Sequence, residues 1–216
     1  MTSIRRAALL MALVAMLVTV FALPAAAASP FLDRYSDKGR EAIADGYECD
    51  FDGRVETCEF VFIRAHDGWI NNNGDVLRGE VLCIDQGVDR YDTQTDEWSA
   101  RILHGCSPAS VSIAKDLASA TASGDVDVAI EECANDDCQV VGSDTLAVRL
   151  RVDGYGDISS SRGNWVDTFG TCRASGNYRG TFNEGQPSAS VDGSAVEVGY
   201  GHIAKGRSKF SLRCGD

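Results

Sequence analysis

The chain has 216 residues, and its 32 acidic residues outnumber its 20 Lys and Arg, which gives a formal net charge of −12. A negative field of this size repels phosphate backbones and anionic lipid headgroups, so the composition argues against nucleic acid and bare membrane surfaces as partners. It favours cations or basic surfaces as partners, or serves solubility alone.

The first 28 residues are typical of a secretory signal peptide. MTSIRR is a short basic start, an apolar run extends from Ala7 to Leu23, and Ala26 and Ala28 supply the small side chains for cleavage after Ala28. A retained membrane anchor is the alternative, but the run has 17 residues and a span needs about 20. No later stretch is apolar enough to span a membrane. Cleavage removes two arginines and no acid, so we expect a secreted mature chain with a formal charge of −14.

Helical patterns are weak. Residues 36–45 and Ser112–Ala122 have a loose helical spacing, but Gly39 and a run of Ser and Thr weaken both patterns. We therefore expect little helix.

Alternation of apolar and polar residues predicts antiparallel strands. TLAVRLRVD, residues 145–153, has four apolar side chains on one face and Arg149 and Arg151 on the other. The same period appears in DVDVAI, AVEVGY and KFSLRC. CEFVFI, residues 58–63, is apolar on both faces, which predicts a central strand.

Turn signals separate these segments. The predicted turns are Asp52-Gly53, Asp67-Gly68, Asn73-Gly74, Asp153-Gly154 and Asp192-Gly193. GYGDIS, residues 154–159, begins like a dinucleotide-binding loop, but Ser159 stands in place of the third glycine, so we expect a hairpin turn. Together these patterns predict an all-β, disulfide-braced antiparallel β-sandwich, either continuous or built from two small packed β units.

A division is predicted at Ser107-Pro108. It would separate the signal peptide (1–28) and an N-terminal cysteine-bracketed β unit (29–107) from a C-terminal β-sandwich unit (108–216). The two halves share a cysteine rhythm, for which duplication is one explanation. One continuous sandwich remains an equal alternative.

Cysteines define the framework. An even count of eight, all after the signal, predicts four disulfides in an exported chain. We expect them to pair in chain order, although 105 pairings are possible. The bridges would be Cys49 with Cys58, Cys83 with Cys106, Cys133 with Cys138, and Cys172 with Cys214. A zinc site is disfavoured, because neither a repeated C-x-x-C nor H-x-x-x-H occurs.

Two acidic clusters leave calcium open, although no cofactor is expected. One comprises Glu131, Glu132, Asp136 and Asp137 around the Cys133–Cys138 pair. The other contains Asp85, Asp89, Asp92, Asp96 and Glu97, whose spacing does not match an EF-hand loop. A solvated hairpin explains the second cluster better.

Catalytic signatures are missing. There is no G-x-S-x-G, H-E-x-x-H, Walker A or C-x-x-C motif. His66, His104 and His202 lie in separate segments, and many serines and aspartates could complete a triad with any of them, which gives the triad little weight. Catalytic, metal-binding and cofactor-binding residues are therefore not assigned.

Tryptophans offer a sugar-binding alternative. Trp69, Trp98 and Trp165 are more often core anchors in a β-protein than stacking platforms. Trp69, between Gly68 and the amides of Asn71–Asn73, is the one we expect to be exposed in a loop.

RYDTQTDEW, residues 90–98, resembles the YD…T…W segment of kelch-type propeller blades. It occurs once, whereas a propeller needs at least four blades of about 50 residues, so it predicts a hairpin with Tyr91 packed across from Trp98. CEFVFI, RGEVLCID, YDTQTDEW and SKFSLRC together resemble uncharacterised secreted β-rich proteins of high-GC Gram-positive bacteria. That resemblance implies export and no assigned activity.

These observations favour an exported, non-catalytic β-sandwich protein that acts as a binding or structural module at or outside the cell surface. Its ligand is unknown, with a cell-surface or extracellular protein or a glycan as the expected partner class. A secreted hydrolase and a protease inhibitor, which would present a rigid disulfide-braced loop, are the alternatives.

Overall fold

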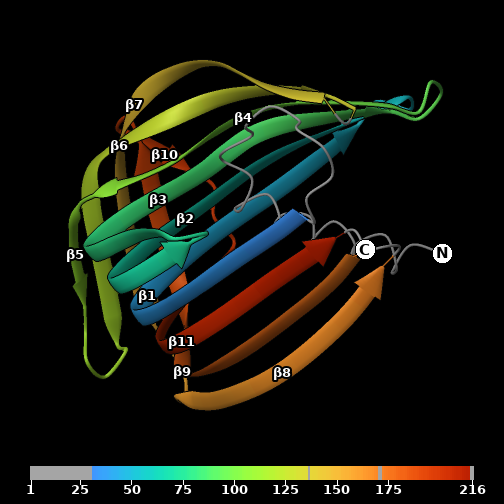
Figure 1. The fold of residues 1–216 in the computed structure, drawn as a ribbon. Coiled ribbons are helices and arrows are strands. Elements are labelled where there is room, and N and C mark those ends of the chain that lie inside the picture. The colour runs from blue at the N-terminus through green and yellow to red at the C-terminus, as the bar shows by residue number, and fades with distance from the viewer. Residues whose placement is uncertain (1–30, 136, 170–171, 215–216) are drawn as a thin grey trace.

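The computed structural model describes residues 31–135, 137–169 and 172–214, so the predicted signal peptide lies outside the described residues. These ranges form strands and turns and contain no helix, which confirms the all-β prediction (Figure 1). Consequently no helix of the described ranges has the length and hydropathy to cross a membrane. The strands are β1 (Phe31–Phe51), β2 (Val55–Asn72), β3 (Asp75–Asp92), β4 (Glu97–Pro108), β5 (Ser110–Ile113), β6 (Ser119–Ala134), β7 (Asp137–Gly154), β8 (Ser159–Phe169), β9 (Cys172–Val191), β10 (Ser194–Val196) and β11 (Tyr200–Cys214).

All strands belong to one antiparallel sheet. The hydrogen-bonded path runs from β9 through β11, β1, β2, β3, β4 and β6 to β7, and β7 pairs with β9 again. β9 can pair with the strands at both ends of this path, because its Gly185–Val191 part pairs with β7 while its Cys172–Gly185 part pairs with β11. β8 pairs with the Cys172–Phe182 part of β9, which β7 does not reach. It forms the outer edge of the layer that contains β9, β11 and β1 (Figure 1).

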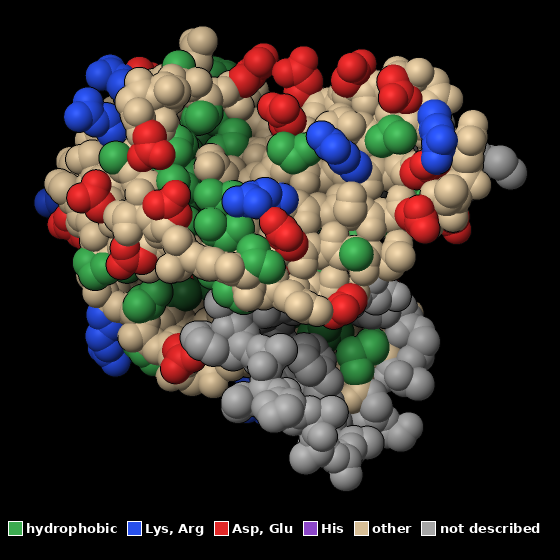
Figure 2. Space-filling view, turned by 90° about the horizontal axis from the view of Figure 1, so that it is seen from above, with side chains coloured by type: hydrophobic (Ala, Val, Ile, Leu, Met, Phe, Trp, Pro, Cys, Tyr) green, Lys and Arg blue, Asp and Glu red, His purple; other side chains and the backbone are tan. Residues whose placement is uncertain are grey.

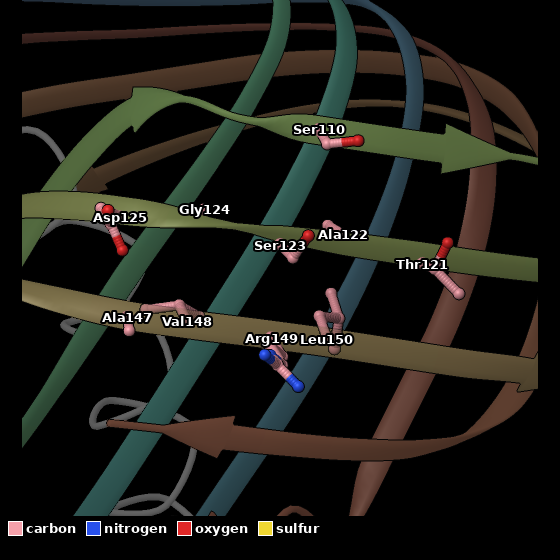
Figure 3. Close-up of a pocket in the computed structure, with 10 residues that line it drawn as sticks. All are labelled: Ser110, Thr121, Ala122, Ser123, Gly124, Asp125, Ala147, Val148, Arg149 and Leu150. Carbon is pink, nitrogen blue, oxygen red and sulfur yellow. The ribbon is translucent and has the colours of Figure 1, made fainter. Parts of the chain in front are cut away.

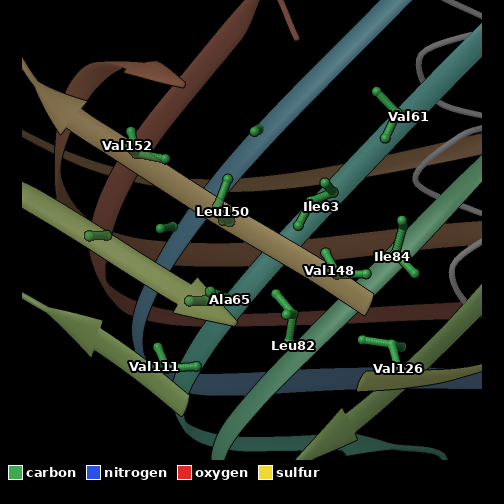
Figure 4. Packing of buried hydrophobic residues seen from close by; sticks show 14 of the residues in the cluster. Val61, Ile63, Ala65, Leu82, Ile84, Val111, Val126, Val148, Leu150 and Val152 are labelled. Atoms are coloured by element: carbon green, nitrogen blue, oxygen red, sulfur yellow. The ribbon is translucent and has the colours of Figure 1, made fainter. Parts of the chain in front are cut away.

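Two layers of this sheet pack around the hydrophobic core. β5, β6 and β7 cross over β1, β2 and β3 at a large angle, and their inward side chains meet between the layers (Figure 4). Ile63, Leu82 and Ile84 face Val148 and Leu150, and all five are nearly inaccessible to solvent (Figure 4). The face of β1–β3 that carries Ile63 and Leu82 is called the core face below.

Residues on both sides of Ser107-Pro108 contribute to this one core. The predicted boundary coincides with the end of β4, and β6 pairs directly with β4. The division into two units stays a prediction.

The strand predictions are largely confirmed. CEFVFI lies in β2, between β1 and β3, and TLAVRLRVD lies in β7 with its four apolar side chains buried. AVEVGY, however, is interrupted: β10 ends at Val196, Gly199 donates its backbone N–H to Asp45 O, and β11 begins at Tyr200. Residues 36–45, which had a weak helical spacing, lie in β1, because β2 and β11 pair with them on both sides.

Three predicted turns form tight connections. Gly53, Asn73-Gly74 and Asp192-Gly193 have positive φ angles where β1 meets β2, β2 meets β3, and β9 meets β10. Two predictions were wrong. Asp67-Gly68 lies inside β2, and Asp153-Gly154 ends β7 while still paired to β9.

The chain between β7 and β8 is not a hairpin, which corrects the prediction for GYGDIS. β7 and β8 do not pair with each other; each pairs with a different part of β9. Gly156, with φ of 86°, lies in this connection. The connection therefore moves the chain along the edge of β9.

The side of β1 and β2 opposite the core face carries a buried polar cluster. Arg64 is 8% exposed and forms ion pairs with Asp37 at 2.5 Å and Glu41 at 2.7 Å, measured from Nη2 to the carboxylate oxygens. Tyr35 Oη accepts a hydrogen bond from Arg64 and donates one to Asp37. Burial alone would raise the pKa of Asp37, but Arg64, Tyr35 and the Ser208 amide bring this pKa below its usual value. We call this side the polar face.

Candidate functional site

The eight predicted cysteines form the four bridges that chain order suggested. Each bridge joins residues directly opposite in neighbouring strands, with Cα–Cα distances of 3.9 to 4.0 Å. In EECANDDCQ, Cys133 and Cys138 close the hairpin between β6 and β7. These sulfurs are therefore structural.

The acidic clusters do not converge on a cation site in the described ranges. Asp92 already accepts hydrogen bonds from Arg54 and from the backbone amides of Gln94 and Thr95, so its carboxylate shapes the turn. Only two groups of three potential ligand atoms lie within 4.8 Å of one another in the described part of the chain, and each contains two cysteines already bonded to each other. Asp136 lies outside the described residues. Calcium binding, which the sequence left open, stays untested.

Asp85, from the second acidic cluster, has a different environment. It lies on the polar face in β3, opposite Phe62 and His104, and burial raises the pKa of its carboxyl to about 7. The folded state therefore holds this proton more tightly than the unfolded chain, whose Asp has a pKa near 3.8. Below the pKa of the unfolded chain the Asp85 carboxyl is protonated in both states and does not lower the free energy of unfolding. As the pH rises from there through the pKa of the folded state, the free energy of unfolding decreases.

Replacing Asp85 with Asn is expected to raise the free energy of unfolding at pH 8 by about 1 to 4 kcal/mol and to change it little at pH 4. Denaturant titrations at both pH values measure the difference. Asp125→Asn, at an exposed site in β6, is the control and should show no such dependence. An equal effect of Asp85→Asn at both pH values would contradict the buried-proton explanation.

All three histidines lie on the polar face. His66 of β2 is opposite Glu41 of β1, and His104 of β4 is opposite Asp85 of β3. His202 of β11 is opposite Ile43 of β1. Burial lowers the pKa of His66 and of His202, which keeps both imidazoles neutral near pH 7. The structure thus places them on one face, a relation that their spacing in the sequence does not reveal.

The tryptophans differ in environment. Trp98 is opposite Tyr91, as predicted for that hairpin, and packs against the small cluster of Ala100, Ile102 and Cys133. Trp165, 42% exposed, packs against Phe210 in a tilted arrangement with ring centroids 5.9 Å apart. Trp69 is half-buried in β2 and not in a loop, because the hairpin begins only at Asn73.

A basic groove, which the sequence reasoning did not identify, crosses the part of the sheet formed by β8, β9, β11 and β1. Here the core face continues past the cover of β5–β7 into solvent. The hydrogen bond from Arg40 Nη1 to Ile113 O, 2.6 Å long, joins β1 to the end of β5 and marks where that cover stops. The groove has a volume of about 990 Å³.

Two transverse rows of side chains form the groove walls. The Arg207 row contains directly opposed residues from four adjacent strands: Arg162, Arg179, Arg207 and Lys38. The Lys205 row, two residues away along each strand and therefore on the same face, contains Ser160, Thr181, Lys205 and Arg40. Neighbouring strands are about 4.8 Å apart, so each row spans about 14 Å.

Glycine backbone forms the floor between the rows. Gly180, Gly206 and Gly39 are directly opposite one another in β9, β11 and β1, and Gly68 continues this line in β2. A Cβ added at Gly39 would lie 2.3 Å from Asp67 O, and one added at Gly206 would lie 2.6 Å from Arg179 O. Side chains other than glycine would force the strands apart here.

The groove is strongly positive. Its lining contains six cations and one acid, Asp67, which pairs with Arg40 through atoms 2.5 Å apart. The other five cations have no ion-pair partner among residues 34–135, 137–169 and 172–214. Asp37 in β1, Asp167 in β8 and Glu184 in β9 lie at alternate positions and thus on the polar face.

Other parts of the surface differ from the groove. The face seen from above, on the side of β6 and β7, carries many acidic side chains and scattered Lys and Arg (Figure 2). A second hollow, about 470 Å³, lies over β5, β6 and β7, and small side chains line most of it (Figure 3). Only Asp125 and Arg149 carry charge there. The basic groove is therefore the stronger candidate site.

One signal in the sequence pointed to the groove. Lys205, Arg207 and Lys209 alternate with small or apolar residues, and an alternation of cations marks a basic strand face. The net acidic composition, which favoured cations or basic surfaces as partners, concealed this groove. The register that brings Arg162 and Arg179 beside Arg207 also joins segments far apart in the sequence.

Comparison with protein-family models, curated proteins and solved structures gave no significant match.

Proposed function

We propose that this protein is an exported, non-catalytic binding module whose basic groove holds an anionic ligand. The predicted signal peptide supports export, and four disulfides are typical of proteins that fold in an oxidising compartment. The observation that carries the proposal is the pair of rows in which five cations without ion-pair partners among the described residues face one groove.

The physical argument concerns repulsion. Like charges directly opposite in neighbouring strands are destabilising, and the Arg207 row places four of them side by side. An anion between the rows replaces this repulsion with charge-assisted hydrogen bonds, and the planar guanidinium groups of three arginines can each bind an oxyanion through two N–H groups. Ligand binding therefore raises the free energy of unfolding above that of the ligand-free protein.

The lining offers little for the hydrolase alternative. Among the described residues that line the groove, none is a histidine, and the single carboxylate is held by Arg40. All three histidines lie on the polar face, and His66 lies behind the glycine floor. Electrostatic binding is the chemistry that this arrangement favours.

Dextran sulfate, titrated into the oxidised protein at low salt and followed by calorimetry, tests the proposal. Arg179→Glu combined with Arg207→Glu should weaken binding at least about 30-fold, because removing one buried or hydrogen-bonded charge contact commonly costs 1.5 to 3 kcal/mol. The matched control is Arg149→Glu with Arg151→Glu, which makes the same change in net charge on β7. Equal weakening by both pairs, or no binding by the wild-type protein, would contradict a specific groove site.

A further inference from the structure

We infer that the ligand of the basic groove is a linear acidic polysaccharide that lies across the strands, with successive anionic sugars over successive strands. This inference rests on the proposed anion-binding function and adds the chemical class and orientation of the ligand. Three features of the groove carry it.

The first feature is the repeat of the cations. Arg162, Arg179, Arg207 and Lys38 come from consecutive strands, so one positive charge recurs at the strand spacing of about 4.8 Å. The length of one hexose unit in an extended chain is close to this spacing. A polymer with one acidic group per sugar can therefore present acids along the whole length of the row, whereas a compact anion can reach only part of it.

The second feature is the polar chemistry beside the cations. The next transverse positions beyond the Arg207 row hold Asn164, Asn177, Lys209 and Ser36, again directly opposite one another. Amides and hydroxyls donate and accept hydrogen bonds, as sugar hydroxyls require. Thr181 and Ser160 supply hydroxyls on the other wall. The groove thus combines charge with partners for neutral hydroxyl groups.

The third feature is a single aromatic side chain at one end of the Arg207 row. Trp69 of β2 lies opposite Lys38 and extends the Arg207 row by one strand. Its indole can pack against the face of a terminal sugar ring. Single-stranded nucleic acid requires aromatic platforms for successive bases, but the eight positions of the two rows contain no aromatic side chain. A glycan therefore fits the groove better than nucleic acid does.

The test uses a length series of oligogalacturonates, which are linear and carry one carboxylate per sugar. Calorimetry should show affinity rising from one to about five sugars and then levelling off, since four strands at about 4.8 Å supply the cations and Trp69 adds a fifth position. Arg162→Ala, at the outer strand, should move the plateau to about four sugars. Trp69→Ala should weaken oligogalacturonate binding at least about 5-fold and leave inorganic pyrophosphate binding unchanged.

Four further outcomes of these binding experiments are distinguishable. In the first outcome, dextran sulfate binds through Arg179 and Arg207, oligogalacturonates do not bind, and sulfated oligosaccharides show no length dependence. This result overturns the inference, while the proposed function stands. Equal or tighter binding of single-stranded oligonucleotides of matched charge at the same residues overturns it in favour of nucleic acid. If affinity reaches a length plateau with sulfated but not with carboxylated oligosaccharides, the result supports a linear acidic polysaccharide and identifies its acidic group as sulfate. No binding of any anion removes the proposed function as well.

Discussion

Replacing Arg64 with alanine is expected to reduce the free energy of unfolding by about 3 to 5 kcal/mol, the usual cost of removing one partner from a buried ion pair. Arg64 is 8% exposed, and its guanidinium satisfies Asp37, Glu41 and Tyr35 at once. Without it, two carboxylates would remain on the polar face with no cation to offset their desolvation. Equilibrium unfolding in urea measures the loss.

Arg101 provides the matched control, because it forms an ion pair with Glu132 in which both side chains are more than half exposed. Arg101→Ala should cost less than about 1 kcal/mol. A triple variant with Arg64→Met, Asp37→Leu and Glu41→Leu should recover much of the stability, since apolar replacement of a whole buried ionic cluster is often neutral. Similar losses for Arg64→Ala and Arg101→Ala would contradict the assigned burial of the Arg64 cluster.

Removing the Cys172–Cys214 bridge with two alanines is expected to cost about 4 kcal/mol, the chain-entropy value for a loop of this length. The bridge joins β9 to β11 across a sequence separation of 42, at the end of the two strands that carry Arg179 and Arg207. Denaturant unfolding under non-reducing conditions measures the change.

The Cys133–Cys138 bridge, with a sequence separation of 5, is the comparison. Its double alanine variant should lose about 2 kcal/mol, because a short loop restricts the unfolded chain less. If the two variants lose the same amount, loop entropy does not govern the contribution of these bridges. The Cys172–Cys214 variant should also keep its groove affinity after correction for the unfolded fraction, since neither cysteine lines the groove.

Local patterns predicted the strands well where burial repeats along one segment. Leu146 to Val152 alternate in sequence and are alternately buried in β7. Cysteine pairing in chain order agrees with the structure because each bridge joins two strands that are neighbours in the sheet and lie at most 42 residues apart. Asn73-Gly74 and Asp192-Gly193 formed turns because their residues accept positive φ.

Relations between distant strands were not available from the sequence. In the sequence Gly39 only weakens a helical pattern, and its role becomes visible when pairing places Gly68 and Gly206 on either side of it. Asp67-Gly68 looks like a turn, but pairing to β1 and β3 keeps it extended. The basic groove was missed for the same reason, since its cations come from four strands whose order is a tertiary property.

The pairing of β1 with β11 has a kinetic consequence. Phe31–Asp45 is hydrogen-bonded to Tyr200–Cys214 along fifteen residue pairs, so the ladder of β1 is incomplete until the last strand arrives. Long-range strand pairing is slow to form, and domains dominated by it fold in milliseconds to seconds. We therefore expect refolding in which local hairpins and their disulfides form early, and in which the basic groove, built across β8, β9, β11 and β1, is among the last features to be assembled.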